Sequence, residues 1–157
     1  MKNIFKIYVV LLLFSFPTLF AQDIVPRKPE SNVPIIVAQN FESKFPKKDP
    51  VWFSQYQGRY DNKLVYEARF LFDNRYSAAI YNREGDLIAF TATISTGEIP
   101  EKAINYMKEH YPYQTITEAG MVDRGKKSTV ELGIYINNRF TVVVFDKDGN
   151  FIKTTLG

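Results

Sequence analysis

Cysteine is absent from the 157 residues of this chain, and histidine occurs only once, at position 110. The lack of cysteine excludes disulfide bonds, thiolate metal sites, a cysteine nucleophile and a lipid attached to cysteine. A single histidine excludes a multi-histidine metal site, and a Ser-His-Asp relay would have to be built on His110. The eight glycines are scattered, so the chain has no glycine-rich phosphate loop. The sequence therefore predicts neither a metal nor a cofactor.

An excess of one charge is also lacking. The chain has 20 Lys and Arg against 17 Asp and Glu. Two of the basic residues, Lys2 and Lys6, lie in a segment that we predict to be removed, which leaves 18 against 17. A balanced charge gives no reason to expect a nucleic-acid partner.

The longest uncharged run, from Ile7 to Ala21, is too short to span a membrane. It has 15 residues and contains Pro17, whereas a spanning helix needs about 20 residues. Lysines before an apolar run and a small residue at its end are typical of a secretory signal peptide, which is favoured over a membrane anchor. We therefore predict that residues 1–21 are a signal peptide and that the mature chain is soluble and periplasmic or secreted.

The rest of the chain has the length of one domain. Residues 22–32 hold two prolines and few apolar residues, which is typical of an extended lead-in. Hydrophobic residues make up 45% of the sequence, with 13 Phe and 10 Tyr, which is enough to build a core without disulfides or metals. We predict one folded domain over residues 33–157.

This domain contains an internal repeat. Residues 34–46 align with residues 100–112 at an offset of 66, and prolines bound both segments. Residues 73–88 align with residues 137–152 at an offset of 64. A fixed period of this kind is the sequence signature of repeated structural units.

Each proline-bounded segment is predicted to be a helix, because proline is tolerated in the first turn and a second proline ends the helix. Apolar residues recur at helical spacing and form one stripe per helix. They are Val37, Ala38, Phe41 and Phe45 in the first copy and Ala103, Ile104, Met107 and Tyr111 in the second. Such stripes indicate core packing rather than a cofactor site.

After each helix the hydrophobic period changes to two, which is typical of strands with one buried face. The predicted buried residues are Tyr66, Ala68, Phe70 and Phe72 in the first copy and Val130, Leu132, Ile134 and Ile136 in the second. Further strands are expected at residues 51–56, 76–81, 87–94, 115–122, 140–145 and 151–156. The predicted fold class is α+β, a tandem duplication (residues 33–98 and 99–157) of a helix plus antiparallel strands, with the helices on one face of an antiparallel sheet.

Some of these packing residues resemble those of a known family. They are Phe41, Lys44, Phe45 and Pro46 at the helix end, Trp52, the strand Tyr66-Glu67-Ala68-x-Phe70, and the turns Tyr81 to Gly85 and Phe145 to Gly149. In this pattern the chain resembles the PepSY-like proteins, small secreted proteins of Gram-negative envelopes that are also called beta-lactamase-inhibitor-like. The resemblance covers about residues 33–157. It implies the fold of the beta-lactamase inhibitory proteins and provides no catalytic residues.

Several charged features have both a functional and a structural interpretation. Residues 146–150 (DKDGN) are similar to the start of a calcium loop, but the matching segment of the first copy has Arg83, so a hairpin turn is favoured. Glu67 and Glu131 occupy equivalent strand positions, where surface cross-strand pairing is a simpler interpretation than a carboxylate pair for glycoside cleavage. His110 aligns with the flank position of Lys44 on the first helix, which indicates a surface edge.

An excess of aromatic residues points to a binding surface. If the helices cover the face of Tyr66 and Val130, the opposite face should carry large aromatic and charged residues. The candidate binding residues are Trp52, Tyr56, Glu67, Arg69, Tyr81, Glu131, Tyr135 and Phe145. Trp, Tyr and Arg are enriched where interfaces carry their binding energy. The alternative is that these aromatics form cross-strand pairs or lie half-buried at the sheet edge.

Three functions remain open at this point. The favoured one is a non-enzymatic, inhibitor-like binding protein that docks a protein or peptide partner of the envelope on its open sheet face. The second is a small-molecule or lipid carrier, which needs a cavity between helices and sheet. The third is an enzyme that uses carboxylates alone, which needs two carboxyl groups within about 5–10 Å in a cleft. If the aromatic rings prove buried, the loops at Asp61-Asn62 and Arg124 to Lys127 are the next candidates.

Overall fold

The computed structural model describes residues 32–57 and 63–156. The predicted signal peptide, nearly all of the predicted lead-in and the candidate loop at Asp61-Asn62 lie outside the described residues. The described elements follow one another as helices α1 (Ile35–Lys44) and α2 (Glu101–His110), a short 3-10 helix η1 (Thr96–Glu98), and strands β1 (Val51–Gln57), β2 (Lys63–Phe72), β3 (Arg75–Tyr81), β4 (Leu87–Thr93), β5 (Glu118–Arg124), β6 (Lys127–Ile136), β7 (Arg139–Asp146) and β8 (Phe151–Leu156).

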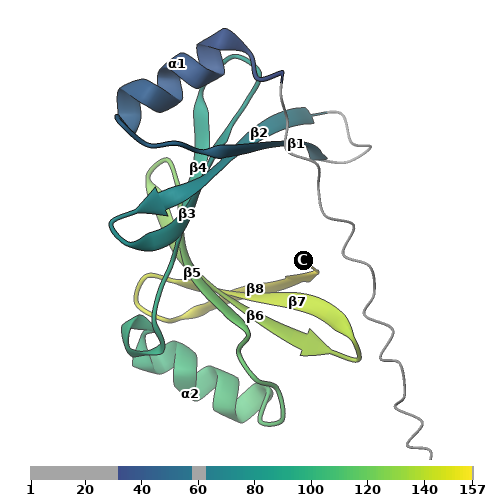
Figure 1. Ribbon diagram of the computed structural model, residues 1–157. Coiled ribbons are helices and arrows are strands. Elements are labelled where there is room, and N and C mark those ends of the chain that lie inside the picture. Colours follow the sequence, from purple (N-terminus) through teal and green to yellow (C-terminus); the bar gives the residue numbers. More distant parts are fainter. Residues whose placement is uncertain (1–31, 58–62, 157) are drawn as a thin grey trace, which may run out of the picture.

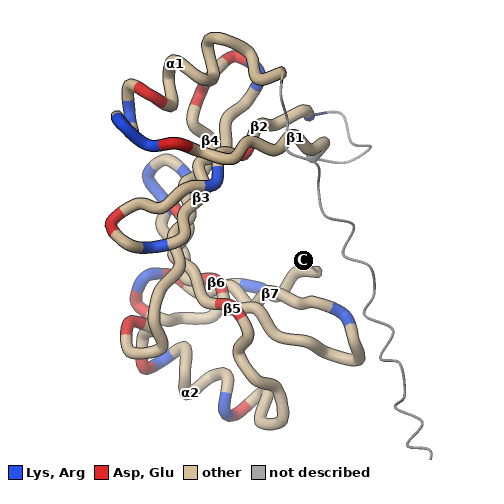
Figure 2. The backbone as a smooth tube through the Cα atoms, in the orientation of Figure 1, with Lys and Arg blue, Asp and Glu red and all other residues tan. Residues whose placement is uncertain are grey.

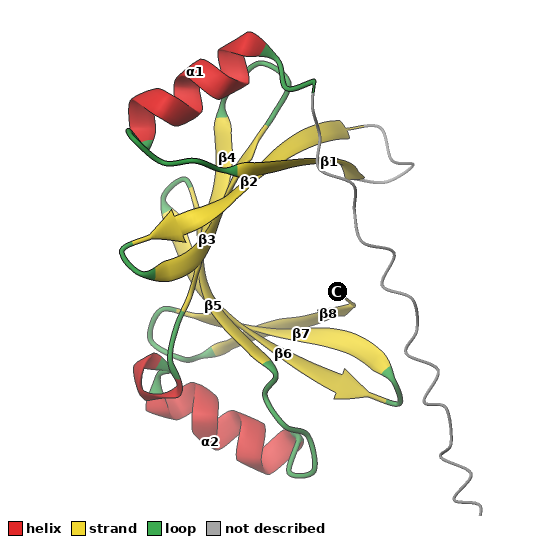
Figure 3. Cartoon of the chain, in the orientation of Figure 1, coloured by secondary structure: helices red, strands yellow, loops and turns green. Residues whose placement is uncertain are grey.

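The eight strands form one antiparallel sheet in which every strand pairs with its neighbour in sequence, in the order β1 to β8. The sheet is strongly curved, and both helices lie against its convex face while the concave face is left open (Figures 1 and 3). This arrangement confirms the predicted α+β class with helices on one face of an antiparallel sheet.

The two helices begin and end in the same way. Pro34 and Pro100 precede them with identical backbone angles (φ −56°, ψ 137°). At the other end, the N–H groups of Phe45 and Tyr111 donate to carbonyls four residues earlier at 2.8 Å, and the backbone then leaves the helical region. Proline thus sets the start of each helix, as the sequence predicts.

The side chains between α1 and the sheet form an aromatic cluster. The ring of Phe70 lies 4.9 Å from those of Phe41 and Phe45, and the Phe45 ring lies 5.5 Å from those of Phe72 and Phe90. Under α2 the corresponding core is mostly aliphatic and consists of Ile99, Ala103, Met107, Val130, Leu132, Ile134, Val143 and Phe145. Both apolar stripes predicted from the sequence therefore pack on the sheet.

Two-residue turns fix the register of the hairpins. Asp73 and Asn74 join β2 to β3 with φ of 49° and 61°, and Asn137 and Asn138 join β6 to β7 with φ of 50° and 61°. Asn and Asp tolerate this left-handed conformation, which two-residue hairpins require. The resulting registers place Tyr81 opposite Tyr66 and Phe145 opposite Val130.

The turns after β3 and β7 lie under the starts of the helices. Gly85 (φ 91°) lies close to Ile36 and accepts a hydrogen bond from Asn40 Nδ2 at 2.9 Å, and Gly149 (φ 84°) lies against Pro100. The carboxylate of Asp146 accepts hydrogen bonds from the N–H groups of Asp148 and Asn150 at 2.9 and 2.8 Å. The hydrogen bonds from Asn150 hold the pKa of Asp146 below its usual range. These contacts support the hairpin-turn interpretation of residues 146–150.

Candidate functional site

The concave face of the sheet holds a groove of about 1180 Å³. Its lining comes from residues that alternate with those facing the helices, together with the segment that follows α1. Among the lining residues are Lys47, Lys48, Val51, Glu67, Arg69, Tyr76, Ala78, Thr91, Thr93, Glu118, Gly120, Val122, Glu131, Gly133, Phe140 and Val142. We call this hollow the concave groove.

Small side chains form the floor of the concave groove. Ala78 pairs with Thr91, and Thr91 pairs with Val122, so the three lie in one row across β3, β4 and β5. Ala78 and Val122 are 7% and 8% exposed, so little side-chain bulk rises from the centre of the sheet. Gly133 makes room for Phe140, because a Cβ at this glycine would lie 2.6 Å from Phe140 Cζ. The sequence of the central strands thus creates the hollow.

One wall carries an arginine on β2. The Nε atom of Arg69 donates to Glu67 Oε1 at 2.8 Å, and the guanidinium lies 4.5 Å from the centre of the Phe53 ring. About half of the Arg69 side chain remains exposed, whereas Glu67 is largely buried. The ion pair and the ring hold the guanidinium in place while leaving its outer part accessible to a ligand.

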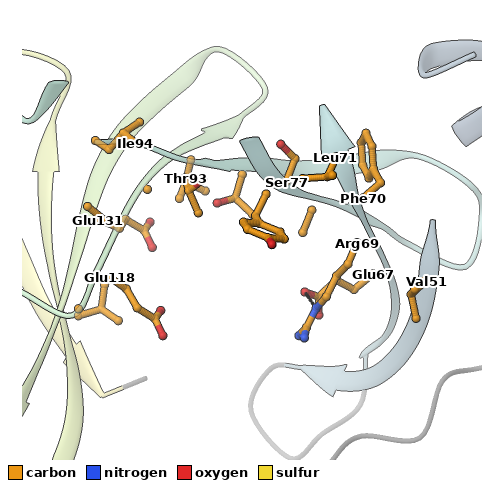
Figure 4. A pocket seen from close by; sticks show the side chains of 18 of the residues that line it. Val51, Glu67, Arg69, Phe70, Leu71, Ser77, Thr93, Ile94, Glu118 and Glu131 are labelled. Carbon is orange, nitrogen blue, oxygen red and sulfur yellow. Dashed lines mark hydrogen bonds and ion pairs between the residues drawn. The ribbon is translucent and has the colours of Figure 1, made fainter. Parts of the chain in front are cut away.

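The opposite wall is acidic. Glu131 Oε1 accepts hydrogen bonds from Arg124 Nη1 at 2.7 Å and from Thr129 Oγ1 at 3.2 Å. Glu118 is exposed on the same wall and has no ion pair within the described part of the chain. Figure 4 shows Glu118 and Glu131 on one side of the hollow and Glu67 and Arg69 on the other. Figure 2 shows basic and acidic positions interspersed over both halves of the chain.

Four of the eight candidate binding residues lie on the predicted concave face. Glu67, Arg69 and Glu131 line the groove. Tyr135 is opposite Phe140 in the β6–β7 pair, with the two ring centres 5.4 Å apart, and is 53% exposed near the end of the groove. These four residues come from β2 and β6, the two strands whose alternation is clearest in the sequence.

The predicted facing of the other four candidates is wrong. Tyr81 and Phe145 are 1% and 0% exposed, because the hairpin registers put them on the helix-covered face with Tyr66 and Val130. Trp52 pairs with Ala68 on that face, is half-buried, and has its ring 5.4 Å from the Phe41 ring.

Tyr56, two residues after Trp52, lies on the same side of β1 and is 63% exposed. It borders a separate hollow of about 550 Å³ with Leu64, Asn82 and Ile88, away from the groove. Of the four misassigned aromatic residues, it is therefore the one that keeps a largely exposed ring.

Burial has an electrostatic consequence for Tyr81. It raises the pKa of the phenol to about 12, and the hydroxyl has no hydrogen-bond partner within the described residues. Ionisation of Tyr81 at physiological pH is therefore negligible, and its role in the structure is to fill the core beneath α1.

Several groove residues were missed in the sequence. Glu118 belongs to the predicted strand 115–122, whose alternation with Gly120 and Val122 would have placed it on the open face. Lys47 and Lys48 follow α1 and enter the groove because Lys47 adopts φ of 61°, a feature that has no clear sequence signal.

The remaining candidates have structural surroundings of their own. Arg124 is held by Glu131 beside an exposed turn at Gly125. His110 is exposed, and its ring stacks on Tyr106 at 3.9 Å between centres. Across the described residues there is no cluster of three or more His, Cys, Asp or Glu that could hold a metal ion. None of the helices in the described ranges is long and apolar enough to cross a membrane.

Comparison with known proteins finds similarity at the level of the fold. No protein-family model and no curated protein matches the sequence. Among solved structures, a DUF2874 family protein from Bacteroides ovatus has a TM-score of 0.66 and 18% identity over 81% of this chain and 89% of its own.

Two further solved structures have similar folds. A protein from Bacteroides eggerthii that is described as periplasmic has a TM-score of 0.66 and 13% identity over 80% of this chain and 89% of its own. A BLIP-like protein from Bacteroides fragilis has a TM-score of 0.61 and 8% identity over 81% and 88%. The chain therefore has the fold of these proteins, at sequence identities too low to transfer an activity.

Proposed function

We propose that this chain is a non-enzymatic periplasmic binding protein, inhibitor-like in its mode of action, which holds a segment of a protein or peptide partner in the concave groove. The observation that carries the proposal is the groove itself. One whole face of an eight-stranded sheet is free of helices, is curved, and encloses about 1180 Å³ between two charged walls.

The chemistry of the groove supports a polypeptide as the ligand. Binding surfaces between proteins combine an apolar centre with a polar rim. Here Ala78 and Val122 lie at the centre, with Arg69 on one wall and Glu118 and Glu131 on the other. A peptide segment can supply the apolar groups and both signs of charge that such a surface requires.

A carrier function receives less support. It requires a cavity between helices and sheet, and under α1 this space is filled by aromatic rings whose centres lie about 5 Å apart, such as those of Phe41, Phe45 and Phe70. The groove on the other face is open to solvent along its length, which suits a polypeptide better than a lipid tail.

The location in the envelope rests on the sequence. A signal peptide over residues 1–21 would export the chain to a compartment where it would function without disulfides. The similarity in fold to a protein described as periplasmic agrees with this location.

We infer that the two halves, residues 33–98 and 99–157, descend from a tandem duplication of a PepSY-like unit. In support, each half has one proline-capped helix followed by four strands. Each half also has a left-handed two-residue turn and a glycine turn under the start of its helix. In this interpretation the groove forms where the concave faces of the two units join through β4 and β5.

The proposal is tested by binding measurements on surface variants of the mature chain. Partners are captured from the envelope fraction of the native host and identified by mass spectrometry, and their affinities are then measured by calorimetry. Arg69→Glu and Glu131→Lys should each weaken binding of the identified partner about tenfold or more, which corresponds to about 1.4 kcal/mol.

The matched control is Lys108→Glu, a charge reversal at an exposed position on α2, on the convex side of the molecule. It should leave affinity unchanged. If Lys108→Glu weakens binding as much as the groove variants do, or if the groove variants bind normally, the concave groove is not the binding site.

A further inference from the structure

The last strand of the sheet has one exposed edge. β8 pairs with β7 on one side, and no described strand lies along its other side. The corresponding strand of the first half, β4, has its outer edge occupied by β5. An exposed strand edge offers a row of unpaired N–H and C=O groups to which another strand can add.

The side chains of β8 are suited to such pairing. The strand contains β-branched and apolar residues, no proline and a single charge, Lys153. Ile152 is 50% exposed and Leu156 is 73% exposed, although both are apolar. An edge strand that avoids pairing usually carries more charge, a proline or a polar surface.

The register with β7 assigns the faces of β8. Thr154 is opposite the core residue Val143, and Leu156 is opposite buried Thr141, so both lie on the helix side. Thr155 is opposite Val142, which lines the groove, and Lys153 lies two residues before it on the same concave side. Ile152 lies at the irregularity between Phe151 and Lys153, where the strand bulges.

We propose that two copies of this chain pair through their β8 strands, antiparallel and with a two-fold axis at Thr154. In antiparallel pairing, residues directly opposite each other share a face, so only some registers are allowed. A register centred on Thr154 puts Thr154 opposite its own copy, Lys153 opposite Thr155, and Ile152 opposite Leu156. A register centred on Lys153 would place the two lysines opposite each other, which is unfavourable.

The proposed register is self-complementary, as a two-fold interface must be. It pairs apolar Ile152 with apolar Leu156, pairs threonine with threonine, and keeps the two charges apart, which are favourable cross-strand combinations. It also uses all of β8 beyond the bulge. The contact is short, so we expect a reversible dimer whose population rises with concentration.

Such a dimer has a consequence for the concave groove. A two-fold axis perpendicular to the sheet keeps both concave faces on the same side, so the two grooves open in the same direction. A partner with two copies of the recognised segment could then engage both grooves at once and gain avidity.

The absence of cysteine makes the register directly testable. In the full mature chain, a single Thr154→Cys substitution places two thiols opposite each other across the axis, within the Cα separation that a disulfide requires. Lys153→Cys places the thiol opposite Thr155, and Tyr113→Cys introduces an equally isolated thiol at a position that is 93% exposed. Mild oxidation should crosslink Thr154→Cys at least tenfold faster than either control.

Analytical ultracentrifugation provides an independent measurement. The unsubstituted mature chain should shift from monomer toward twice the mass as its concentration rises. Leu156→Lys should reduce that shift, whereas Ile35→Lys, at a comparably exposed apolar position on α1, should not. The proposal is overturned if the unsubstituted chain sediments as a monomer at all concentrations, or if the three cysteine variants crosslink at equal rates.

Discussion

Tyr81 lies directly opposite Tyr66 across strands β2 and β3, and both rings are therefore buried beneath α1. The two-residue turn at Asp73 and Asn74 sets this pairing, since it makes Phe72 and Arg75 the first pair of the hairpin. The same relationship holds between Val130 and Phe145 in the second half. Buried aromatic residues at the ends of β3 and β7 thus serve the core rather than the open face.

We predict that Tyr81→Phe stabilises the protein or leaves its stability unchanged. The substitution keeps the ring and removes a buried hydroxyl that has no partner within the described residues, and such an unsatisfied group costs about 1–3 kcal/mol. Urea denaturation should show a gain of up to about 1 kcal/mol, part of the cost being offset by lost contacts. Tyr113→Phe, at a 93% exposed position, is the control and should change nothing. A loss of stability in Tyr81→Phe would mean that the hydroxyl makes a favourable contact.

Phe41→Ala should cost about 3–5 kcal/mol of unfolding free energy, as large-to-small substitutions of buried aromatics do. Phe41 is 2% exposed and contacts the rings of Phe45, Trp52 and Phe70, so its removal leaves a cavity under α1. Denaturant titration gives the measurement. The comparison is Ile35→Ala on the same helix, which is 76% exposed and should cost less than about 0.5 kcal/mol. Equal effects of the two substitutions would contradict the assignment of the helix face.

Three glycines form a graded series for substitution by alanine. At Gly97 nothing lies within 4 Å of an added Cβ, and the change should be within about 0.5 kcal/mol of neutral. Gly125 has the same open space but φ of 63°, so strain alone should cost about 1 kcal/mol. At Gly149, with φ of 84°, the added Cβ would lie 2.9 Å from the backbone nitrogen of Ala103. Strain and overpacking together should cost roughly 3 kcal/mol or more.

Thermal or urea unfolding of the three variants measures the series. The order of destabilisation should be Gly149→Ala above Gly125→Ala above Gly97→Ala. A small effect at Gly149 would show that the turn after β7 is not packed under α2 as described.

Stability should also depend on pH through Glu98. Hydrogen bonds from the N–H and hydroxyl of Ser95 and from Arg75 lower the pKa of this carboxyl to about 2. Because the pKa is lower in the folded state than the ordinary value of about 4.3, the stabilisation is complete above that value and is lost as the pH falls toward 2. Glu98→Gln should therefore lose less stability than the unsubstituted chain between pH 5 and pH 2. Added salt should reduce the difference, since the Arg75–Glu98 pair is exposed. Parallel acid titration curves for the two proteins would contradict this role of Glu98.

The sequence predicts the fold well because its local signals agree with one another. Proline positions mark the helices, and alternation from Tyr66 to Phe72 identifies a half-buried strand. In contrast, β3 and β7 are apolar on both sides, for example at Ala78 and Ala79, so alternation alone does not assign their faces. The facing of Tyr81 follows only when the register of the two-residue turn is counted through the hairpin.

The candidate site was predictable only in part, for a related reason. Glu67, Arg69, Glu131 and Tyr135 follow from the alternation of β2 and β6. The hollow between them depends on the curvature of the sheet and on small residues such as Gly120 and Gly133 in different strands, which no single segment reveals. The approach of Lys47 and Lys48 to the groove depends on the path of the chain after α1, and that path is set by tertiary packing.

The consecutive strand order also determines how the chain can fold. Six of the seven strand pairs join neighbours through short connections, and only the β4–β5 pair closes a longer loop, residues 94–117, which contains α2. Most contacts are therefore close in sequence, which lowers the entropy cost of forming them and favours rapid folding. A chain that emerges from a secretion channel from its N-terminus could add each strand to the growing sheet in turn. The β4–β5 junction, at the centre of the groove, would be the one step that waits for an intervening helix.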